Sequence, residues 1–159
     1  MRRKDREITD KNRILEILQT AKILHLGLFD EGYPYVVPLH YGFTCGEEGA
    51  VTFYMHGARE GHKLDLIRKD PHVCIELECD VEEESGGDVP CAYGSFYASV
   101  IARGTAEILE DPEEKAEGLK CLMRCQTGRE FEISPKMAMA VAVIRVKVDE
   151  LTAKSKAKQ

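Results

Sequence analysis

The stretch ILHLGLFDEGYPYVVPLHYGF, residues 23–43, indicates the fold class. Two runs of mainly β-branched, aromatic and aliphatic residues, 23–29 and 33–43, are separated by Asp30-Glu31-Gly32, a sequence typical of a tight turn. We therefore predict that the first two strands form a β-hairpin. Because side chains alternate along a strand, the odd-numbered residues of the second run form an apolar face, and the even-numbered ones form the other.

Two prolines interrupt this second strand. Pro34 and Pro38 have no backbone N–H group, so they cannot donate hydrogen bonds to a neighbouring strand. Such a strand lies at an edge, at a bulge, or beside something other than another strand, and this predicts a ligand cleft. The alternative is an edge strand in which His40 has only a structural role.

The rest of the chain alternates long β-rich runs with helical segments. Further strands are predicted at 51–56, 72–79, 96–109 with a bend at Gly104, and 139–148. Helices are predicted at 10–21 with a cap at Thr9-Asp10, from about 57–63 to Pro71, and from the Asp111 cap to about Cys125. The total is about six strands and three helices. No G-x-G-x-x-G fingerprint follows the first strand, so we predict a mainly β fold with flanking helices and an antiparallel barrel.

Length and composition limit the class of protein. The chain has 159 residues, of which 43% are hydrophobic, and a net charge of -6. This favours a single domain over 1–159, with 1–21 as an N-terminal extension and helix and 150–159 as a flexible tail. An acidic chain without an apolar run of about 20 residues indicates no nucleic-acid partner, no membrane span and a cytoplasmic location. The six cysteines form no CxxC pair, so no metal site is expected.

An acidic segment overlaps the end of the strand predicted at 72–79 and extends beyond it. Residues 76–88 contain seven acidic residues in thirteen, with Ser85-Gly86-Gly87 among them. This composition predicts a solvated, mobile loop. We assign it no function, because runs of charge are usually solvated faces.

The segment 54–65, Tyr-Met-His-Gly-Ala-Arg-Glu-Gly-His-Lys-Leu-Asp, contains the residues suited to binding an anion. A strand that ends in small residues before a helix offers backbone N–H groups to a phosphate. Arg59, His62 and Lys63 add positive charge there. The alternative is an ordinary strand-to-helix connection with charged surface residues.

Together, Gly-Tyr-Pro-Tyr-Val-Val-Pro (32–38), His-Gly-Ala-Arg-Glu-Gly-His-Lys (56–63) and the N-terminal residues 1–8 resemble a known family. The chain resembles flavin-nucleotide-binding proteins related to nitroimidazole-resistance (Nim) proteins, over nearly its whole length. That group is similar in fold to pyridoxamine 5'-phosphate oxidase. The resemblance implies an antiparallel split β-barrel, a homodimer, and FMN bound at the interface between the subunits.

The resemblance also implies site residues, grouped by the part of the cofactor they would contact. Those bordering the isoalloxazine ring would be Val36, Val37, Pro38, Leu39 and His40. Those around the ribityl phosphate would be His56, Ala58, Arg59 and Lys63, with Lys63 the most important because an ammonium group suits a phosphate. Ser99, Val100 and Ile101 would approach the cofactor from an interface strand.

The sequence does not decide the role of Cys91 or whether the C-terminal tail contacts the cofactor. Cys91 is either a packing residue or a reactive thiol near the flavin. Leu151-Thr152-Ala153-Lys154 resembles a family ending of Thr-Gly-Lys, but alanine replaces the glycine, so a contact of the tail with the cofactor is in doubt.

The implied function is that of an FMN-dependent oxidoreductase, either nitroreductase-like or related to pyridoxamine-phosphate oxidase. It would reduce a small planar electron acceptor such as a nitroaromatic compound, with His40 as the catalytic proton donor. One alternative is a non-catalytic flavin carrier or sensor. Another is a split barrel that uses a deazaflavin or haem. Pyridoxamine-phosphate oxidation itself is not favoured, because the chain lacks an arginine-rich pattern for the substrate phosphate.

Overall fold

The predicted hairpin is present in the computed structural model, which describes residues 3–47 and 49–158. Its strands, β2 (Ile23–Asp30) and β3 (Tyr33–Cys45), are antiparallel, and every residue of β2 has a partner in β3. Glu31 and Gly32 join them with positive φ angles of 37° and 107°. A two-residue hairpin turn requires this backbone conformation, so the local sequence determines the register.

The described part of the chain contains seven strands rather than the six expected, together with four α-helices. The remaining strands are β1 (Glu7–Ile8), β4 (Val51–Gly57), β5 (His72–Glu84), β6 (Gly94–Ile108) and β7 (Ala142–Lys156). The α-helices are α1 (Lys11–Thr20), α2 (His62–Lys69), α3 (Pro112–Thr127) and α4 (Pro135–Ala138). Short 3₁₀ turns cover Lys4–Arg6 and Pro90–Ala92.

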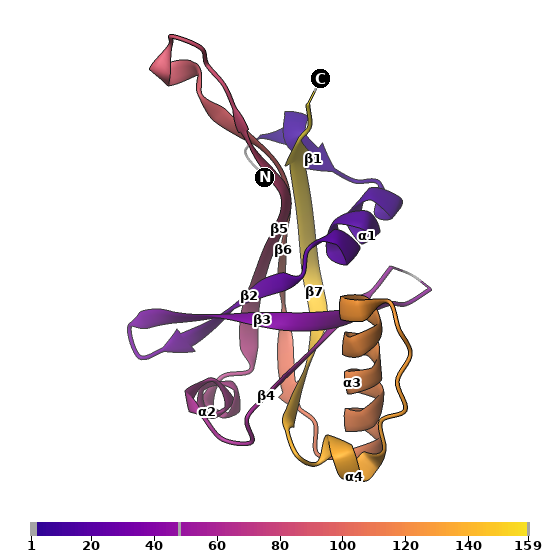
Figure 1. Ribbon diagram of the computed structural model, residues 1–159. Helices are drawn as coiled ribbons and strands as arrows, with labels where there is room; N and C mark the ends of the chain where they lie inside the picture. The colour runs from indigo at the N-terminus through magenta and orange to yellow at the C-terminus, as the bar shows by residue number, and fades with distance from the viewer. Residues whose placement is uncertain (1–2, 48, 159) are drawn as a thin grey trace.

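The strands close into a ring. Their order is β1-β7-β4-β3-β2-β5-β6, and β6 also pairs with β7. All pairings are antiparallel. Figure 1 shows β3 crossing the long β5, β6 and β7 strands, with α3 along one side and α2 below the hairpin. The predicted mainly antiparallel barrel with flanking helices is confirmed.

β3 changes its neighbour in the middle of the strand. Residues up to His40 pair with β2, whereas those from Tyr41 onward pair with β4. β3 and β4 therefore diverge at this point, and His40 is the last residue before the divergence. The inward side chains of the ring fill its core, each burial contributing roughly 1.5–3 kcal/mol. The largest that are fully buried are Tyr41, Phe53, Ile17, Leu18, Leu24, Leu26, Met55, Leu64, Leu66, Ile75, Leu77 and Ile144.

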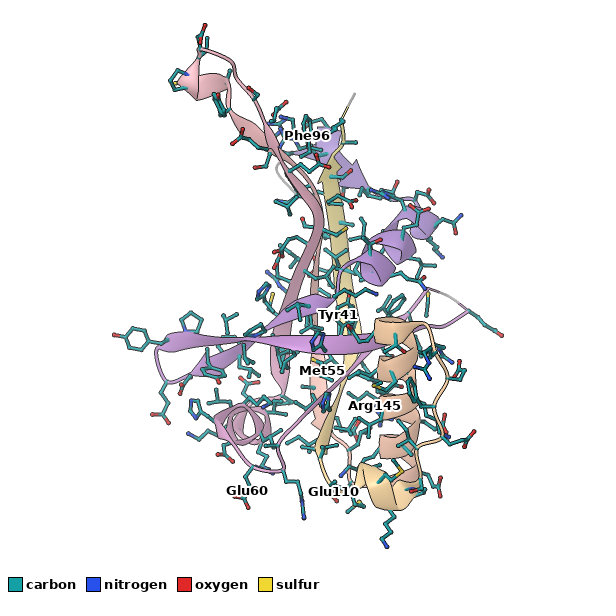
Figure 2. The ribbon with its side chains drawn as sticks, in the orientation of Figure 1. Tyr41, Met55, Glu60, Phe96, Glu110 and Arg145 are labelled. Carbon is teal, nitrogen blue, oxygen red and sulfur yellow. The ribbon has the colours of Figure 1, made fainter. Side chains whose placement is uncertain are left out.

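Helices α1 and α3 are held against β3 by specific contacts. The buried hydroxyl of Tyr41 donates to the carbonyl of Leu18 (2.7 Å) and lies 3.1 Å from that of Ala21. A Cβ atom on Gly42 would stand 2.5 Å from the Cα atom of Leu122. Glycine is therefore required where α3 crosses the strand. Figure 2 shows Tyr41 on β3, close to α1 and α3.

Both predicted helix caps are confirmed. The side chain of Asp10 accepts from the amide of Asn12 (3.0 Å) at the start of α1. Asp111 accepts from the amides of Glu113 and Glu114 (3.0 and 2.9 Å) at the start of α3. These bonds satisfy amides that lack partners within the helix. None of the helices in 3–47 and 49–158 is long and apolar enough to cross a membrane.

The strand predicted at 72–79 is confirmed, but β5 continues to Glu84, so the prediction of a solvated loop at 76–88 is wrong as far as residue 84. The acidic side chains of β5 alternate with Leu77 and Cys79, which are buried, so composition concealed a two-residue period. Lysines from the C-terminal segment pair with Glu82 and Glu84 and offset their charge. In Figure 1 the β5–β6 hairpin projects beyond the barrel.

The expected tail, 150–159, is mostly strand. Residues 151–156 continue β7 and pair with 97–102 of β6. Their polar sequence is typical of a tail, and the β6 residues with which they pair lie about 50 residues earlier in the chain, so no local pattern indicates the strand. The expected bend at Gly104 corresponds to a register shift between Arg103 and Gly104. Residues 1–2 of the N-terminal extension and residue 159 lie outside the described residues.

Candidate functional site

The end of β4 and the start of α2 form the first part of the candidate site. The strand stops at Gly57, and α2 begins after Gly61, whose φ of 142° strongly favours glycine. The amides of Leu64 and Asp65 donate to the carbonyl of Gly61 at 2.9 and 3.3 Å. Because Gly61 has no side chain to cap the helix, the backbone amides of α2 that precede Leu64 are available to bind an anion.

Lys63 folds back over the end of the strand. A Cβ atom placed on Gly57 would stand 2.8 Å from Nζ of Lys63 and 2.9 Å from its Cε. The half-buried lysine therefore occupies the space left by the missing side chain of Gly57. An ammonium group beside the first turn of a helix is suited to a phosphate, which both groups attract.

Two histidines join Lys63. The pKa of His56 is lowered, first by burial and then by the positive fields of His40 and Lys63. His56 lies on β4 next to Gly57, and His40 lies on β3 where the two strands diverge. His40 and Lys63 thus both act on His56 through their charge, and we call these three residues, from β3, β4 and α2, the basic cluster. A bound anion would offset its charge.

His40 is held by its Nδ1 atom. This atom lies 3.3 Å from the carbonyl oxygen of Lys22 and 3.2 Å from Oε1 of Gln126. Sequence reasoning missed Gln126. It lies 86 residues from His40 along the chain, and no local pattern connects the end of α3 with β3. The register of β3 against α3 is what places them together.

The other residues predicted around the phosphate lie on the connection between β4 and α2. Ala58 and Arg59 are both exposed there. His62, which the sequence indicated as a further positive charge, is bound to Asp30, with Nε2 2.7 Å from Oδ2. Its ring also meets the ring of Tyr35 edge-on at 5.1 Å. This contact fixes α2 to the tip of the β2–β3 hairpin.

Alternation divides the residues predicted beside the flavin ring. Val36, Pro38 and His40 are exposed on the outer face of β3, and Val36 is 56% exposed. Val37 and Leu39 point inward and pack against the core. Only the outward set can contact a ring through side chains, whereas the inward pair could do so through the backbone alone.

An apolar cavity of about 500 Å³ adjoins this outer face. It extends over β2, β3, β5 and β6, and Phe29 at its edge is 65% exposed. Its lining includes Gly27, Phe29, Pro34, Val36, Cys74 and Arg103. Gly27 lies opposite Val36 and beside Cys74, so the glycine leaves the middle of the face flat. Apolar faces of this kind are where ligands or other chains bind.

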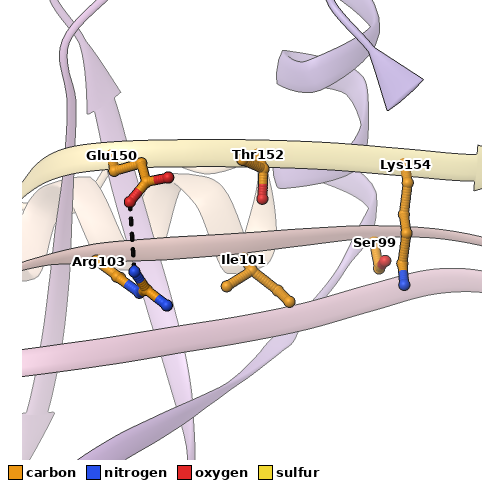
Figure 3. Close-up of a pocket in the computed structure, with 6 residues that line it drawn as sticks. All are labelled: Ser99, Ile101, Arg103, Glu150, Thr152 and Lys154. Carbon is orange, nitrogen blue, oxygen red and sulfur yellow. Dashed lines mark ion pairs between the residues drawn. The ribbon is translucent and has the colours of Figure 1, made fainter. Parts of the chain in front are cut away.

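The residues predicted on the interface strand lie elsewhere. Ser99 and Ile101 line a cavity of about 290 Å³ on the outer face of β6 and β7 (Figure 3). Thr152 and Lys154 of β7 lie opposite them. Val100 points into the core, fully buried. β2 and β5 lie between β6 and β3, and on the other side of the ring β7 lies between β6 and β4. On β7, Ser99 and Ile101 pair with Lys154 and Thr152, whereas His56 pairs with Val143 at the opposite end of the strand. Within one chain this group therefore lies apart from the basic cluster.

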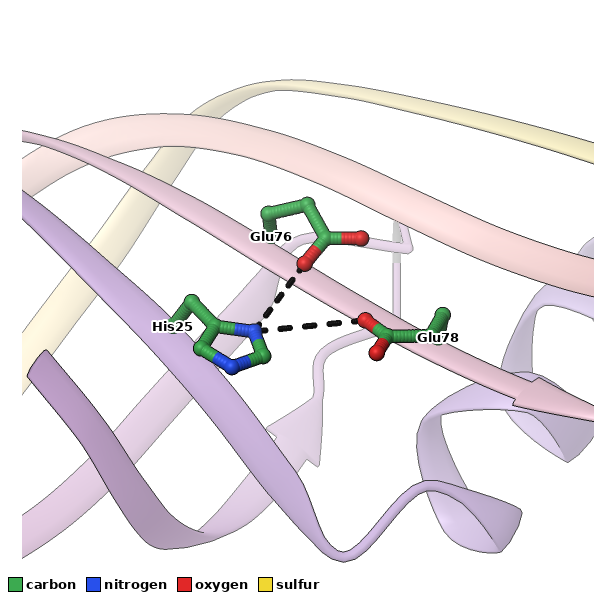
Figure 4. Close-up of side chains that lie close together, drawn as sticks. All are labelled: His25, Glu76 and Glu78. Atoms are coloured by element: carbon green, nitrogen blue, oxygen red, sulfur yellow. Dashed lines mark hydrogen bonds and ion pairs between the residues drawn. The ribbon is translucent and has the colours of Figure 1, made fainter. Parts of the chain in front are cut away.

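A third group lies between these two areas, on adjacent strands. Nδ1 of His25 is 3.1 Å from Oε2 of Glu76 and 3.9 Å from Oε2 of Glu78 (Figure 4). Burial, together with a hydrogen bond to Glu78, raises the pKa of Glu76. Their ligand-type atoms all lie within 4.8 Å of one another, as metal ligands would. The pairing of a histidine with carboxylates accounts for this arrangement without a metal ion.

The cysteines do not form part of the basic cluster. Cys91 is exposed in the 3₁₀ turn between β5 and β6. Cys121 and Cys125, one helical turn apart on α3, lie 3.3 and 3.8 Å from the carbonyl oxygen of Phe43. A hydrogen bond from Cys121 lowers the pKa of Cys125 to about 6 and raises that of Cys121. The lowered pKa of Cys125 arises from this hydrogen bond within α3, and the role of Cys91 stays open.

Comparisons with known proteins agree with the fold. A sequence model described as pyridoxamine 5'-phosphate oxidase matches residues 10–155. A structure from Bacteroides thetaiotaomicron, described as a candidate 5-nitroimidazole antibiotic resistance protein, is 33% identical. The alignment covers 94% of this chain and 86% of that one, with a TM-score of 0.78. A comparison with curated proteins found no match.

Two more distant structures share the fold. The flavocytochrome Anf3 of Azotobacter vinelandii is 21% identical over 99% of this chain and 72% of its own, with a TM-score of 0.78. An FAD-binding protein of Mesorhizobium loti is 18% identical over 96% of this chain and 98% of its own, with a TM-score of 0.66. With the antiparallel ring of strands, these matches confirm the predicted split β-barrel.

Proposed function

Because the chain belongs to the pyridoxamine 5'-phosphate oxidase family, we propose that it binds FMN and acts as an oxidoreductase. The observation that carries this proposal is the position of Lys63, whose Nζ lies over Gly57 beside His56 and the start of α2. A phosphate monoester carries nearly two negative charges at neutral pH. The cluster offers such a group an ammonium, an imidazole and backbone amides.

The ring of the cofactor would lie along the outer face of β3. Val36 and Pro38 offer apolar contact there, and the inward residues Val37 and Leu39 keep the strand fixed in the core. A planar ring needs a flat apolar surface and a few polar groups at its edge. Bound flavin would supply the electron chemistry, while this chain would bind and orient it and manage protons.

FMN and FAD differ in the charge of the phosphate that the basic cluster would bind. The distant relatives of the same fold include a protein described as FAD-binding, so FAD is the ligand to compare. In FAD the ribityl phosphate is part of a diester-like pyrophosphate, which carries less charge at the atom that Lys63 would contact. The charged cluster therefore favours FMN.

Titration of the purified chain with each nucleotide tests this proposal. Quenching of flavin fluorescence reports binding, and the absorption spectrum of protein purified without added cofactor identifies flavin, deazaflavin or haem. We expect saturable binding of FMN that is tighter than that of FAD. Protein that is colourless and ignores both nucleotides would contradict the proposal, and tighter binding of FAD would overturn its choice of FMN.

The oxidoreductase role needs a bound acceptor. We propose a small planar acceptor, of which a nitroaromatic compound is the example to test, because the relative from Bacteroides is described as a candidate 5-nitroimidazole resistance protein. His40, exposed at the divergence of β3 and β4, is the proposed proton donor. Anaerobic reduction of the FMN-loaded protein, followed by a panel of acceptors, distinguishes an enzyme from a flavin carrier. Inertness towards every acceptor would favour the carrier.

The role of His40 has a direct test. The His40→Ala variant should retain FMN binding and lose acceptor turnover by roughly 10²-fold or more. FMN titration of the same preparation is the control for binding. Unchanged turnover would reject His40 as the proton donor.

We propose a homodimer as the working unit. Ser99 and Ile101 are separated from the basic cluster within one chain, whereas a second copy could bring them to it. The exposed apolar residues Phe29, Val36 and Ile101 support a second copy covering this face. Light scattering should give twice the mass of the chain. A monomer that binds FMN with full affinity would reject the shared site.

A further inference from the structure

Gln126, near the end of α3, joins three polar groups around His40. Its Nε2 atom donates to the carbonyl of Tyr41 at 2.7 Å and to that of Lys22 at 3.1 Å. Its Oε1 atom lies 3.2 Å from Nδ1 of His40. One side chain therefore connects the helix, the start of β2 and the point where β3 changes its partner.

These contacts determine which way the amide of Gln126 points. A backbone carbonyl oxygen can only accept a hydrogen bond, so the NH₂ group must face Tyr41 and Lys22. Its carbonyl oxygen, Oε1, then faces His40. This assignment comes from the hydrogen-bond partners, which is how side-chain amides are oriented when hydrogens are not observed.

The orientation of the amide determines the protonation of His40. Oε1 of Gln126 can only accept, so Nδ1 of His40 must carry the hydrogen that it receives. The carbonyl oxygen of Lys22, 3.3 Å from the same Nδ1, is a second acceptor and also requires a hydrogen on that nitrogen. In the neutral ring, Nε2 is then the nitrogen with the lone pair.

We propose that Gln126 is a positioning residue that holds His40 as the Nδ1–H tautomer, so that His40 gains and loses its proton at Nε2. The Nδ1 hydrogen bonds persist whether the ring is neutral or charged, so proton exchange requires no rotation of the ring. The use of that proton in the reduction of an acceptor rests on the proposed function. The tautomer itself is a property of the protein alone.

Nitrogen NMR of the cofactor-free protein tests the proposal. Two-bond ¹H–¹⁵N correlations of ¹⁵N-histidine-labelled protein, recorded in alkaline buffer where imidazoles are neutral, distinguish the two tautomers. The His40→Gln variant identifies the resonances of His40 by their loss. We expect His40 to have a protonated Nδ1 and an unprotonated Nε2. A protonated Nε2, or an equal mixture of tautomers, would overturn the proposal.

Substitutions of Gln126 test whether it is the cause. Gln126→Leu removes the nearer acceptor and leaves only the carbonyl oxygen of Lys22 at 3.3 Å, so an Nε2–H fraction should appear, and Gln126→Ala, which removes the same acceptor, should show it too. Gln19→Leu, on α1, is the matched control and should leave His40 unchanged. A pure Nδ1–H form in Gln126→Leu would overturn the role of Gln126. If that variant fails to fold, a pure Nδ1–H form in Gln126→Ala would overturn it instead.

This experiment is independent of the cofactor. Failure of the proposed function would be seen as an absence of FMN binding in the titration. Failure of the inference would be seen in the tautomer of His40, measured without FMN. The two results can therefore be told apart.

Discussion

Nζ of Lys63 lies over Gly57, close enough that a Cβ atom on Gly57 would stand 2.8 Å from it. The lysine and the glycine are six residues apart, on α2 and β4. Glycine leaves the space, and the lysine places a charge in it. This is where we propose that the anion binds.

The first prediction concerns that space. Gly57→Ala should displace the end of Lys63 and lower FMN affinity several-fold, with little loss of stability because a flexible side chain can move aside. Gly46→Ala is the control, since a Cβ atom there meets only ordinary contacts, the nearest at 3.7 Å. Fluorescence titration measures the affinity. Equal affinities in the two variants would show that Lys63 does not need this position.

The second prediction concerns the charge itself. Lys63→Ala should weaken FMN binding by roughly 10- to 100-fold, the usual effect of losing a hydrogen bond to a charged group. Lys69→Ala, at the other end of α2, removes only an exposed ion pair with Glu31 and should bind FMN normally. If both variants bind FMN equally well, the phosphate lies elsewhere.

The third prediction is a pH dependence caused by His56. Because its pKa is lowered in the fold, the unfolded chain binds more protons between the folded pKa and the ordinary value near 6.5. Stability of the cofactor-free protein should therefore fall as pH decreases below about 6.5. A bound phosphate would favour protonated His56, so FMN should stabilise the protein more at the lower pH.

Thermal unfolding across pH, with and without FMN, measures this effect. The His56→Gln variant is the control, and its midpoint should lose the part of the pH dependence that His56 contributes. Identical pH profiles for the wild type and His56→Gln would contradict the prediction.

The fourth prediction concerns the packing of α3. Gly42→Ala would place a Cβ atom 2.5 Å from backbone atoms of Leu122, which cannot move without shifting the helix. We expect a loss of about 1–3 kcal/mol in the free energy of unfolding. Urea denaturation measures it, with Gly46→Ala as the comparison. A wild-type midpoint in Gly42→Ala would show that α3 is not held at this crossing.

The fifth prediction concerns the C-terminal half of β7. Deletion of 151–159 removes the strand that pairs with 97–102 of β6 and should lower the free energy of unfolding by about 2 kcal/mol or more. Deletion of 157–159 alone spares the pairing and should have little effect. Equal stability of the two truncated chains would mean that this segment does not contribute to the barrel.

The local sequence was sufficient to predict the hairpin, the helix starts and the two faces of β3. The turn at Glu31-Gly32 defined the hairpin, Asp10 and Asp111 marked the helix starts, and alternation in β3 separated outward from inward residues. The basic residues after β4 likewise predict an anion site from the local sequence alone. Each of these depends on neighbours within a few residues.

Tertiary structure decided the rest, because the deciding contacts join distant residues. β5 extends beyond Cys79 to Glu84 because residues 82–84 pair with β6, and residues 151–156 form a strand for the same reason. The meeting of His40 with Gln126, 86 residues away, follows from α3 crossing β3 at Gly42. Composition identifies charged or polar segments, but only the closed ring of strands determines which of these segments pair with β6 and that His40 meets Gln126.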